Sequence, residues 1–412
     1  MSDSIWSDDG RIQMPRYEKL TRIRKVDVTI VGGGLCGILC AYFLKEAGVE
    51  CVILEKDRIG GGTVKHAMAQ ITSQHGLIYS RLLETLGKEK ARMYLDANEF
   101  ALRKYRELAS FIDCDFEEKS SYVYSKTDRR KMEKEVRAAN LLGMKAEFCD
   151  TPELPFHTEG AVRFPEQAQM NPLKFLYGLI KDIEKSDKVT IFERMPVDDW
   201  IKGTTWSGLH ITIPQNIICA THFPFYNKAG GYSNKLYQKH RYMLALENIL
   251  PLSGMYADEA EDGLILRSYG NMLLAGGGTH RIGKEKSGWD ELREQLAFYY
   301  PDAKEKDHWM VQDYISLDGI PYIGPYSGKT PNMYVATGFN GWGMTSAMAA
   351  ALLLTDGILK GVKANGATES YPWGEIFYPD RRIVRSQYFA NVKEKVRENI
   401  MSLLIPKSKI SD

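Results

Sequence analysis

The order of apolar and polar positions near the start of the chain predicts a strand, a helix and a second strand. Residues 26–31 (VDVTIV) form a β-rich apolar run, residues 38–47 read as a helix, and residues 51–54 (CVIL) form a second short apolar run. This succession is typical of the start of an α/β fold. The same patterns predict helices at 80–110, 127–142, 172–185 and 344–359, strands at 189–192, 209–220 and 334–336, and an antiparallel sheet over 240–280.

Glycines at regular spacing join the first strand to the first helix. Gly32, Gly34 and Gly37 follow the pattern G-x-G-x-x-G. The first glycine allows a tight turn, the second lets a pyrophosphate approach the backbone, and the third lets the helix pack close to the sheet. Glu55 ends the second strand, about 20 residues on, where a carboxylate accepts the ribose hydroxyls. The pattern predicts a dinucleotide-binding fold, and Glu55 in place of a basic residue favours FAD or NAD over NADP.

The nucleotide-binding domain is predicted to be discontinuous, because its first strand lies near residue 30 and its last near residue 335. The fold class expected is α/β, with a Rossmann-like nucleotide-binding domain and an α+β substrate domain built on an antiparallel sheet. The boundaries predicted are 26–80, 150–224 and 312–360 for the nucleotide domain, 81–149 and 225–311 for the substrate domain, and 361–412 for a C-terminal extension.

The C-terminal extension contains an amphipathic pattern. Over residues 381–406, apolar residues recur at helical spacing. We expect this helix to pack on its own protein; a partner or an anionic membrane surface is the alternative. The residues of the stripe are Phe389, Val392, Val396, Ile400 and Leu403.

The composition of the chain argues against several classes of protein, among them nucleic-acid-binding and membrane-spanning proteins. The chain has 412 residues, of which 44% are hydrophobic, and a formal net charge of +1, so nothing favours nucleic acid as the main partner. No apolar run approaches the length of a membrane span, and the polar N-terminus does not resemble a secretory signal. The six cysteines lack C-x-x-C or zinc spacing, so we expect no metal site and a reducing, cytoplasmic location.

Several segments of the sequence resemble the D-amino-acid oxidase superfamily of FAD-dependent oxidoreductases, which includes glycine oxidase and sarcosine oxidase. They are residues 26–55, 60–76, 170–172, 193–197, 220–222 and 318–350. The segments ITSQHG and ATHFPF are most similar to the branch that often carries a Rieske iron–sulfur domain. The N-terminal residues Ser4-Ile5-Trp6 are similar to gamma-glutamylputrescine oxidoreductase-like relatives. Because the chain has no C-x-H…C-x-x-H pair, an iron–sulfur partner, if one is used, is expected to be a separate redox protein.

The resemblance implies FAD as cofactor and a set of residues around it. The fingerprint glycines and Glu55 would hold the ADP half, the Val197 backbone would meet the adenine, and Thr63 to Ala67 would pass near the isoalloxazine ring. The loop from Gly338 to Met344 would direct backbone N–H groups to the flavin N1–C2=O edge, and the positive end of the next helix would favour the anionic reduced flavin. The implied cofactor-binding residues are Gly32, Gly34, Gly37, Glu55, Thr63, His66, Val197, Gly338, Asn340, Gly341, Trp342, Gly343 and Met344.

Two histidines in the flavin-proximal stretch leave alternatives open. His66 lies in a context similar to relatives with a histidyl–FAD bond, but one residue longer, so it is either a covalent attachment point or a noncovalent neighbour of the ring. His75 is either a proton shuttle or flavin hydrogen-bond partner, or a structural histidine with its hydrogen bonds satisfied. His222, at the end of a strand, has the same two interpretations.

Arg267 is the candidate anchor for a substrate. In amino-acid-oxidising relatives, an arginine at a comparable place pairs with the substrate carboxylate in a bidentate fork. We expect Arg267 to do so here, helped by Tyr269, Tyr242 or Tyr322; a surface ion pair is the alternative. The catalytic prediction is therefore Arg267, His75 and Tyr269.

The reaction expected is oxidation of a C–N bond in a small amine or amino acid, with hydride transfer to flavin N5 and hydrolysis of the resulting imine. One alternative is a flavin dehydrogenase of a hydroxy acid or polyol phosphate. Another is an electron-transfer flavoprotein that passes electrons to a separate iron–sulfur partner. The electron acceptor stays open.

Overall fold

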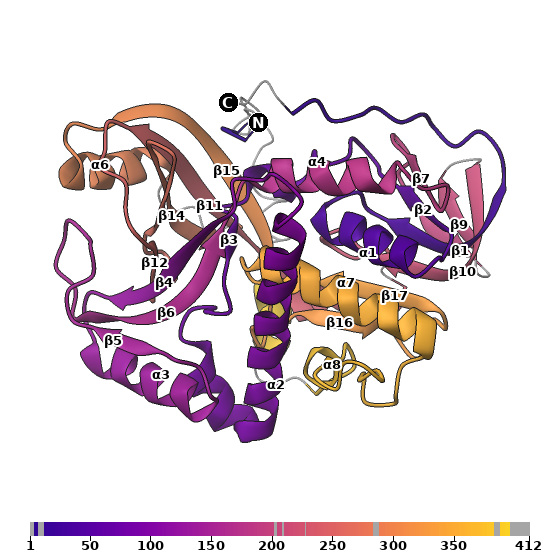
Figure 1. Ribbon diagram of the computed structural model, residues 1–412. Helices are drawn as coiled ribbons and strands as arrows, with labels where there is room; N and C mark the ends of the chain where they lie inside the picture. Colours follow the sequence, from indigo (N-terminus) through magenta and orange to yellow (C-terminus); the bar gives the residue numbers. More distant parts are fainter. Residues whose placement is uncertain are drawn as a thin grey trace.

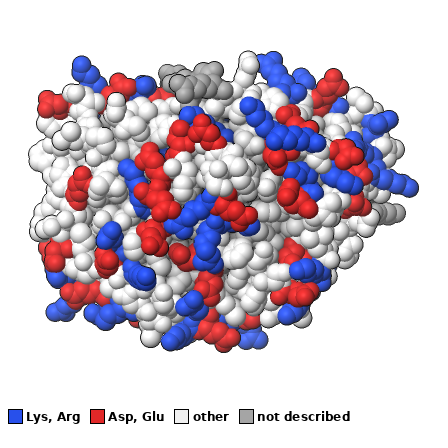
Figure 2. Space-filling model, in the orientation of Figure 1, with Lys and Arg blue, Asp and Glu red and all other residues white. Residues whose placement is uncertain are grey.

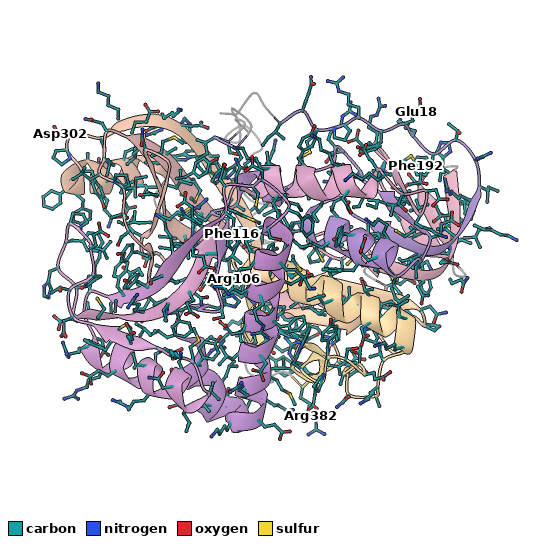
Figure 3. The ribbon with its side chains drawn as sticks, viewed as in Figure 1. Glu18, Arg106, Phe116, Phe192, Asp302 and Arg382 are labelled. Carbon is teal, nitrogen blue, oxygen red and sulfur yellow. The ribbon has the colours of Figure 1, made fainter. Side chains whose placement is uncertain are left out.

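Two β-sheets lie side by side in the computed structural model of the protein (Figure 1). The structure describes residues 4–6, 12–201, 204–207, 210–226, 228–282, 288–382 and 388–395. In Figure 3, Phe192 and Asp302 mark the two outer sides of the molecule, whereas Arg106 and Phe116 lie in the middle, where α2 meets the strands. Figure 2 shows positive and negative side chains intermixed over one face. Among the described residues, no helix is long and apolar enough to cross a membrane.

The first sheet has eight strands and a parallel core. Its main path runs β16-β17-β10-β1-β2-β7, with β9 beside β10 and β8 beside β9. β1 pairs in parallel with both β2 and β10, and every residue of β2 is buried. A parallel strand covered on both faces needs a continuous apolar run, which CVIL supplies. The strands are β1 (Arg24–Val31), β2 (Cys51–Leu54), β7 (Val189–Phe192), β8 (Asp199–Ile201), β9 (Thr204–Ser207), β10 (His210–Cys219), β16 (Tyr322–Pro325) and β17 (Met333–Thr337).

The second sheet has nine strands and is largely antiparallel. Its path runs β15-β11-β14-β13-β12-β4-β6-β3, with β5 beside β6, and only the β12–β4 pair within it is parallel. The strands are β3 (Gln70–Ile71), β4 (Glu117–Ser125), β5 (Glu147–Cys149), β6 (Gly160–Gln169), β11 (Leu236–Glu247), β12 (Met255–Asp258), β13 (Ile265–Tyr269), β14 (Met272–Arg281) and β15 (Lys304–Ser316).

Helices cover both sheets and fill the space between them (Figure 1). α1 packs against α4 and α7 beside the first sheet, and α6 lies against β11 and β14 of the second. α2 is interrupted at Gly87, where φ is 81°. The helices are α1 (Leu35–Glu46), α2 (Ile78–Ala109), α3 (Arg129–Leu141), α4 (Pro172–Ile183), α5 (Tyr232–Lys235), α6 (Trp289–Tyr299), α7 (Gly343–Lys360) and α8 (Gly374–Phe377), with a 3-10 turn η1 (Thr63–His66).

The structure confirms the predicted fold class and the predicted helices and strands, with small shifts at their ends. The predicted domain boundaries differ from the sheet membership at three strands: β3, β6 and β15, whose residues 312–316 were expected in the nucleotide domain although β15 lies in the second sheet. β3 and β6 were expected in the nucleotide domain, but they pair with each other in the second sheet, and β6 also pairs with β4. Sheet pairing is not local in sequence, so the pattern of predicted elements could not reveal it.

The predicted C-terminal stripe is only partly within the described residues. Residues 388–395 are helical, and Phe389 is 67% exposed, so at this position the apolar stripe is not covered. Asn391 is instead buried, and its side-chain amide donates to the carbonyl oxygen of Asn234 at 2.8 Å. Val396, Ile400 and Leu403 lie outside the described residues.

Candidate active site

The glycine turn after β1 has the shape that a pyrophosphate requires. Gly32 has a φ of 110°, and a Cβ there would lie 2.5 Å from the carbonyl oxygen of Ala220. A Cβ on Gly37 would collide with the carbonyl oxygen of Gly32, which explains why this helix residue has no side chain. A Cβ on Gly34 would meet no described atom within 4 Å. Gly34 also caps α1 without a side-chain hydrogen bond from any described residue, so N–H groups of the first turn are open to an anion.

Glu55 lies directly beside this turn. One carboxylate oxygen accepts from the backbone N–H of Gly33 at 2.7 Å, and the other accepts from the N–H of Asp57 at 2.9 Å. Each oxygen keeps a further lone pair for a hydroxyl donor. The segment after β7 runs alongside, since the N–H of Met195 donates to the carbonyl oxygen of Glu55 at 2.8 Å. Val197, two residues further, packs partly buried against two apolar clusters near β1 and β2.

The closing loop after β17, residues 338–344, leads into α7. Gly338 and Gly341 have φ values of 70° and 83°, and Asn340 is also left-handed at 58°. The side-chain oxygen of Asn340 accepts from the backbone N–H of Ser316 at 2.8 Å, which ties the loop to β15. No described side chain caps the first turn of α7. Gly341, Trp342 and Gly343 keep accessible surface, whereas Met344 is buried.

The 3-10 turn η1 carries Thr63 and His66 to the interface between the sheets. The indole N–H of Trp309 on β15 donates to the carbonyl oxygen of His66 at 3.0 Å. His66 is buried, with 8% of its surface exposed. Residues of the N-terminal segment hold the same turn: the Ser4 hydroxyl donates to the carbonyl oxygen of Lys65.

Both ring nitrogens of His75 have hydrogen-bond partners within the protein. Its Nε2 lies 2.9 Å from the carbonyl oxygen of Thr72, which can only accept, so Nε2 carries the proton and Nδ1 accepts from the hydroxyl of Tyr94 at 2.7 Å. Burial lowers the pKa of His75 to about 3. The ring stacks on Trp342, with centroids 5.0 Å apart. These contacts favour a role for His75 in positioning the closing loop, in preference to the predicted role as a proton shuttle.

Arg267 on β13 is fully buried and incompletely hydrogen-bonded. Its Nη2 donates to the carbonyl oxygen of Met170 at 3.3 Å, whereas Nε and Nη1 have no partner among the described residues. The guanidinium carbon lies 5.2 Å from the centroid of Trp6 and 5.9 Å from that of Tyr269. Burial lowers the pKa of Arg267 to about 9. Because Arg267 is fully buried, the alternative interpretation, a surface ion pair, is wrong.

The three tyrosines expected to assist Arg267 are placed differently. The ring of Tyr269 lies beside Arg267, but its hydroxyl donates to Asp115 at 2.5 Å and accepts from the amide of Asn171 at 3.0 Å. Its ring, rather than its hydroxyl, is therefore available at the site. Tyr242 packs against Trp289 of α6, with centroids 4.9 Å apart. Tyr322 belongs to the first sheet, so neither lies next to Arg267.

Sequence reasoning missed Arg241 and Asp313, which lie at the same interface. Both keep accessible surface, yet burial lowers the pKa of Arg241 to about 10 and raises the pKa of Asp313. Asp313 has His222 near it, with Nε2 4.0 Å from the carboxylate, while the same Nε2 donates to the carbonyl oxygen of Gln312 at 3.1 Å. Arg241 lies at the start of the predicted sheet over 240–280, two positions after Lys239, and this spacing was the signal available for it. In the described part of the chain, no group of three or more His, Cys, Asp or Glu residues could hold a metal ion.

Comparison with known proteins places this fold and site in a known class. Residues 27–357 match the family model described as FAD dependent oxidoreductase. The chain is 31% identical over 385 residues to a putative Rieske 2Fe-2S iron-sulfur protein, YhfW, of Bacillus subtilis, covering 89% of this chain and 74% of that protein. Glycine oxidase from Geobacillus kaustophilus aligns with a TM-score of 0.71 at 19% identity, over 88% of this chain and all of that one. L-Proline dehydrogenase from P. horikoshii aligns with a TM-score of 0.72 at 17% identity, over 86% and 97% of the two chains.

A Rossmann-like sheet with a glycine turn after its first strand is the architecture of a dinucleotide-binding protein. The chain belongs to the FAD dependent oxidoreductase family, and it is an enzyme of the D-amino-acid oxidase superfamily. The residues present fit this cofactor, because the open space at Gly34, the uncapped helices α1 and α7, and the carboxylate of Glu55 are the features that FAD needs.

Proposed function

We propose that this enzyme oxidises a C–N bond of a small amine or amino acid that carries a carboxylate, and that Arg267 binds this carboxylate. The observation that carries the proposal is the two buried guanidinium nitrogens, Nε and Nη1, that lack a partner among the described residues. One edge of the group, formed by Nε or Nη1 with the second N–H of Nη2, could donate two parallel hydrogen bonds to a carboxylate. Such a substrate would remove the cost of a buried unsatisfied cation.

The chain's own residues would orient the substrate and exclude water. Arg267 would fix one end of the molecule, and the rings of Trp6 and Tyr269 would keep that end dry. His75 would hold the closing loop through its stacking on Trp342. FAD supplies hydride acceptance at N5. The substrate loses a hydride and a proton to give an imine, and water then converts the imine to a carbonyl compound and an amine or ammonia.

The names of two structural relatives support an amine as the substrate. The two structural relatives described above are named for the oxidation of glycine and of L-proline, both amino acids. The curated relative is named as a Rieske protein, which supports an iron–sulfur protein as a candidate electron acceptor.

Anaerobic reduction of the flavin by a panel of donors tests this function. The panel contains glycine, sarcosine, proline and glutamate on one side, and lactate and glycerol 3-phosphate on the other. We expect loss of the oxidised flavin absorption with at least one amine, at a rate that rises with pH as the ammonium group becomes neutral. Reduction by an alcohol and by no amine, or a rate independent of pH over that range, would contradict the proposal.

A further inference from the structure

The closing loop is fastened to the end of β15. The backbone N–H of Asn340 donates to the carbonyl oxygen of Tyr314 at 3.4 Å. The side-chain oxygen of Asn340 accepts from the backbone N–H and the hydroxyl of Ser316, at 2.8 and 3.1 Å. Asp313 precedes this segment of β15, and its carboxylate lies 3.7 Å from the place that a Cβ on Gly341 would occupy. An acidic side chain of β15 thus lies directly beside the turn that leads into α7.

Asp313 is surrounded by protein but is not sealed off. Its side chain keeps 20% of its surface exposed, although burial raises its pKa. Gly341 is exposed beside it, and Arg241 on the neighbouring strand β11 also keeps accessible surface. The Asp313 carboxylate therefore lies where the closing loop is accessible, and a ligand held by this loop would lie in the field of its charge.

The charge of Asp313 is only partly compensated. One carboxylate oxygen accepts from the backbone N–H of Tyr314 at 3.0 Å, and no described side chain donates a hydrogen bond to the carboxylate. Nε2 of His222 lies 4.0 Å away. Burial raises the pKa of Asp313, whereas His222 and Arg241 lower it. The backbone N–H groups of Tyr314 and Gly341 lower it as well, so several groups around the site favour the ionised carboxylate.

The closing loop is the segment that we expect at the N1–C2=O edge of the flavin, together with the positive end of α7. This helix begins at Gly343, and no described side chain caps its first turn. Reduction to the anionic flavin adds negative charge at this edge, so a positive group there raises the reduction potential and a negative group lowers it. The helix end and the Asp313 carboxylate would therefore act in opposite directions on the same ring.

We propose that the negative charge of Asp313 lowers the reduction potential of the bound flavin by opposing the positive end of α7. The reduced enzyme is then a stronger electron donor to its acceptor. The inference depends on FAD and on the expected place of the closing loop, and it goes beyond the proposed function because it holds for any substrate.

Reduction potentials of the purified flavoprotein test this inference without a substrate. The protein is reduced anaerobically together with a reference dye, and the ratio of oxidised to reduced flavin is compared with that of the dye. We expect Asp313→Asn, which removes the charge at nearly constant shape, to raise the reduction equilibrium constant of the flavin by about 3- to 30-fold, or about 15–45 mV for a two-electron couple. Asp313→Glu keeps the charge and is expected to stay within about 2-fold of the wild type. Asp302→Asn is the matched control, because it makes the same change at the outer side of the molecule (Figure 3).

The outcomes separate a charge effect from a structural one. An unchanged or lower potential in Asp313→Asn would overturn the inference, and so would a shift of the same size in Asp313→Glu or Asp302→Asn. Weaker FAD binding with a wild-type potential would assign Asp313 a structural role only. If Asp313→Asn does not retain FAD, Asp313→Ser offers a smaller neutral side chain with the same expected rise, and an unchanged potential there would overturn the inference. A flavin that no amine reduces would contradict the proposed function and leave this inference standing.

Discussion

The ring of Trp6 lies against the guanidinium group of Arg267, with 5.2 Å between the ring centroid and the guanidinium carbon. Trp6 is fully buried, and its indole N–H donates to the carbonyl oxygen of Ala67 at 2.9 Å. Its ring also meets that of Tyr269 edge-on, with centroids 4.8 Å apart. A residue near the start of the chain thus joins the segment after η1 to the candidate carboxylate anchor.

Replacement of Trp6 measures what this contact contributes. A cation–π contact in a desolvated site contributes about 0.5–2 kcal/mol, so we expect Trp6→Ala to raise the KM for a carboxylated amine by about 2- to 30-fold. Trp6→Phe keeps a ring over Arg267 and is expected to stay within about 3-fold of the wild type. Steady-state kinetics with kcat and KM determined separately provide the measurement. An unchanged KM in Trp6→Ala would show that Trp6 has no part in binding.

Arg267→Met is expected to stabilise the protein while it weakens substrate binding. The variant replaces a buried, incompletely hydrogen-bonded cation by an apolar side chain of similar length, and so removes the cost of burying an unsatisfied charge. Loss of two charge-assisted hydrogen bonds is expected to lower kcat/KM for a carboxylated amine by about 100- to 10,000-fold. Urea unfolding and steady-state kinetics measure the two effects. A destabilised variant with normal kcat/KM would assign Arg267 a structural role only.

The nucleotide-binding part was predictable because its signals are local. Gly32, Gly34 and Gly37 lie within one turn, and Glu55 ends the next strand, so spacing alone is informative. The substrate side depends on contacts between distant segments. No pattern in the sequence predicts that Trp6 contacts Arg267. A bulge between His240 and Tyr242 also shifts the register of the β11–β14 pairing, so the partners of Arg241 could not be predicted by counting residues.

Alanine substitutions of two fingerprint glycines should distinguish a loss of cofactor binding from a loss of folding. Gly34 has a φ of −80° and open space, so we expect Gly34→Ala to fold in normal yield but to lose FAD, because the methyl group occupies the approach of the phosphate. Gly37→Ala meets the backbone of Gly32 and is expected to give little folded protein. Yield of monodisperse protein and the flavin-to-protein ratio are the measurements. A normal flavin ratio in Gly34→Ala would argue against this site for the pyrophosphate.

The flavin is expected to be noncovalent. The sequence around His66 is one residue longer than the corresponding sequence of histidyl–flavin relatives. The indole of Trp309 holds the turn by donating to the backbone carbonyl oxygen of His66. Acid precipitation should therefore release all the yellow colour into the supernatant. Colour retained in the pellet, and lost in His66→Ala, would instead establish a covalent bond at His66.

His75 should make the protein lose stability on mild acidification. Burial lowers its pKa to about 3 in the folded protein, whereas an unfolded histidine titrates near about 6.5. Between these values the unfolded chain binds more protons, so stability from this group is complete above about pH 6.5 and declines as the pH falls toward 3. At pH 5.5 the loss is about 1.4 kcal/mol relative to pH 7.5. Urea unfolding at both pH values should show this loss in the wild type and in His157→Asn, an exposed control, but not in His75→Asn. Equal losses in His75→Asn and the wild type would mean that His75 is not held neutral by its contacts with Thr72 and Tyr94.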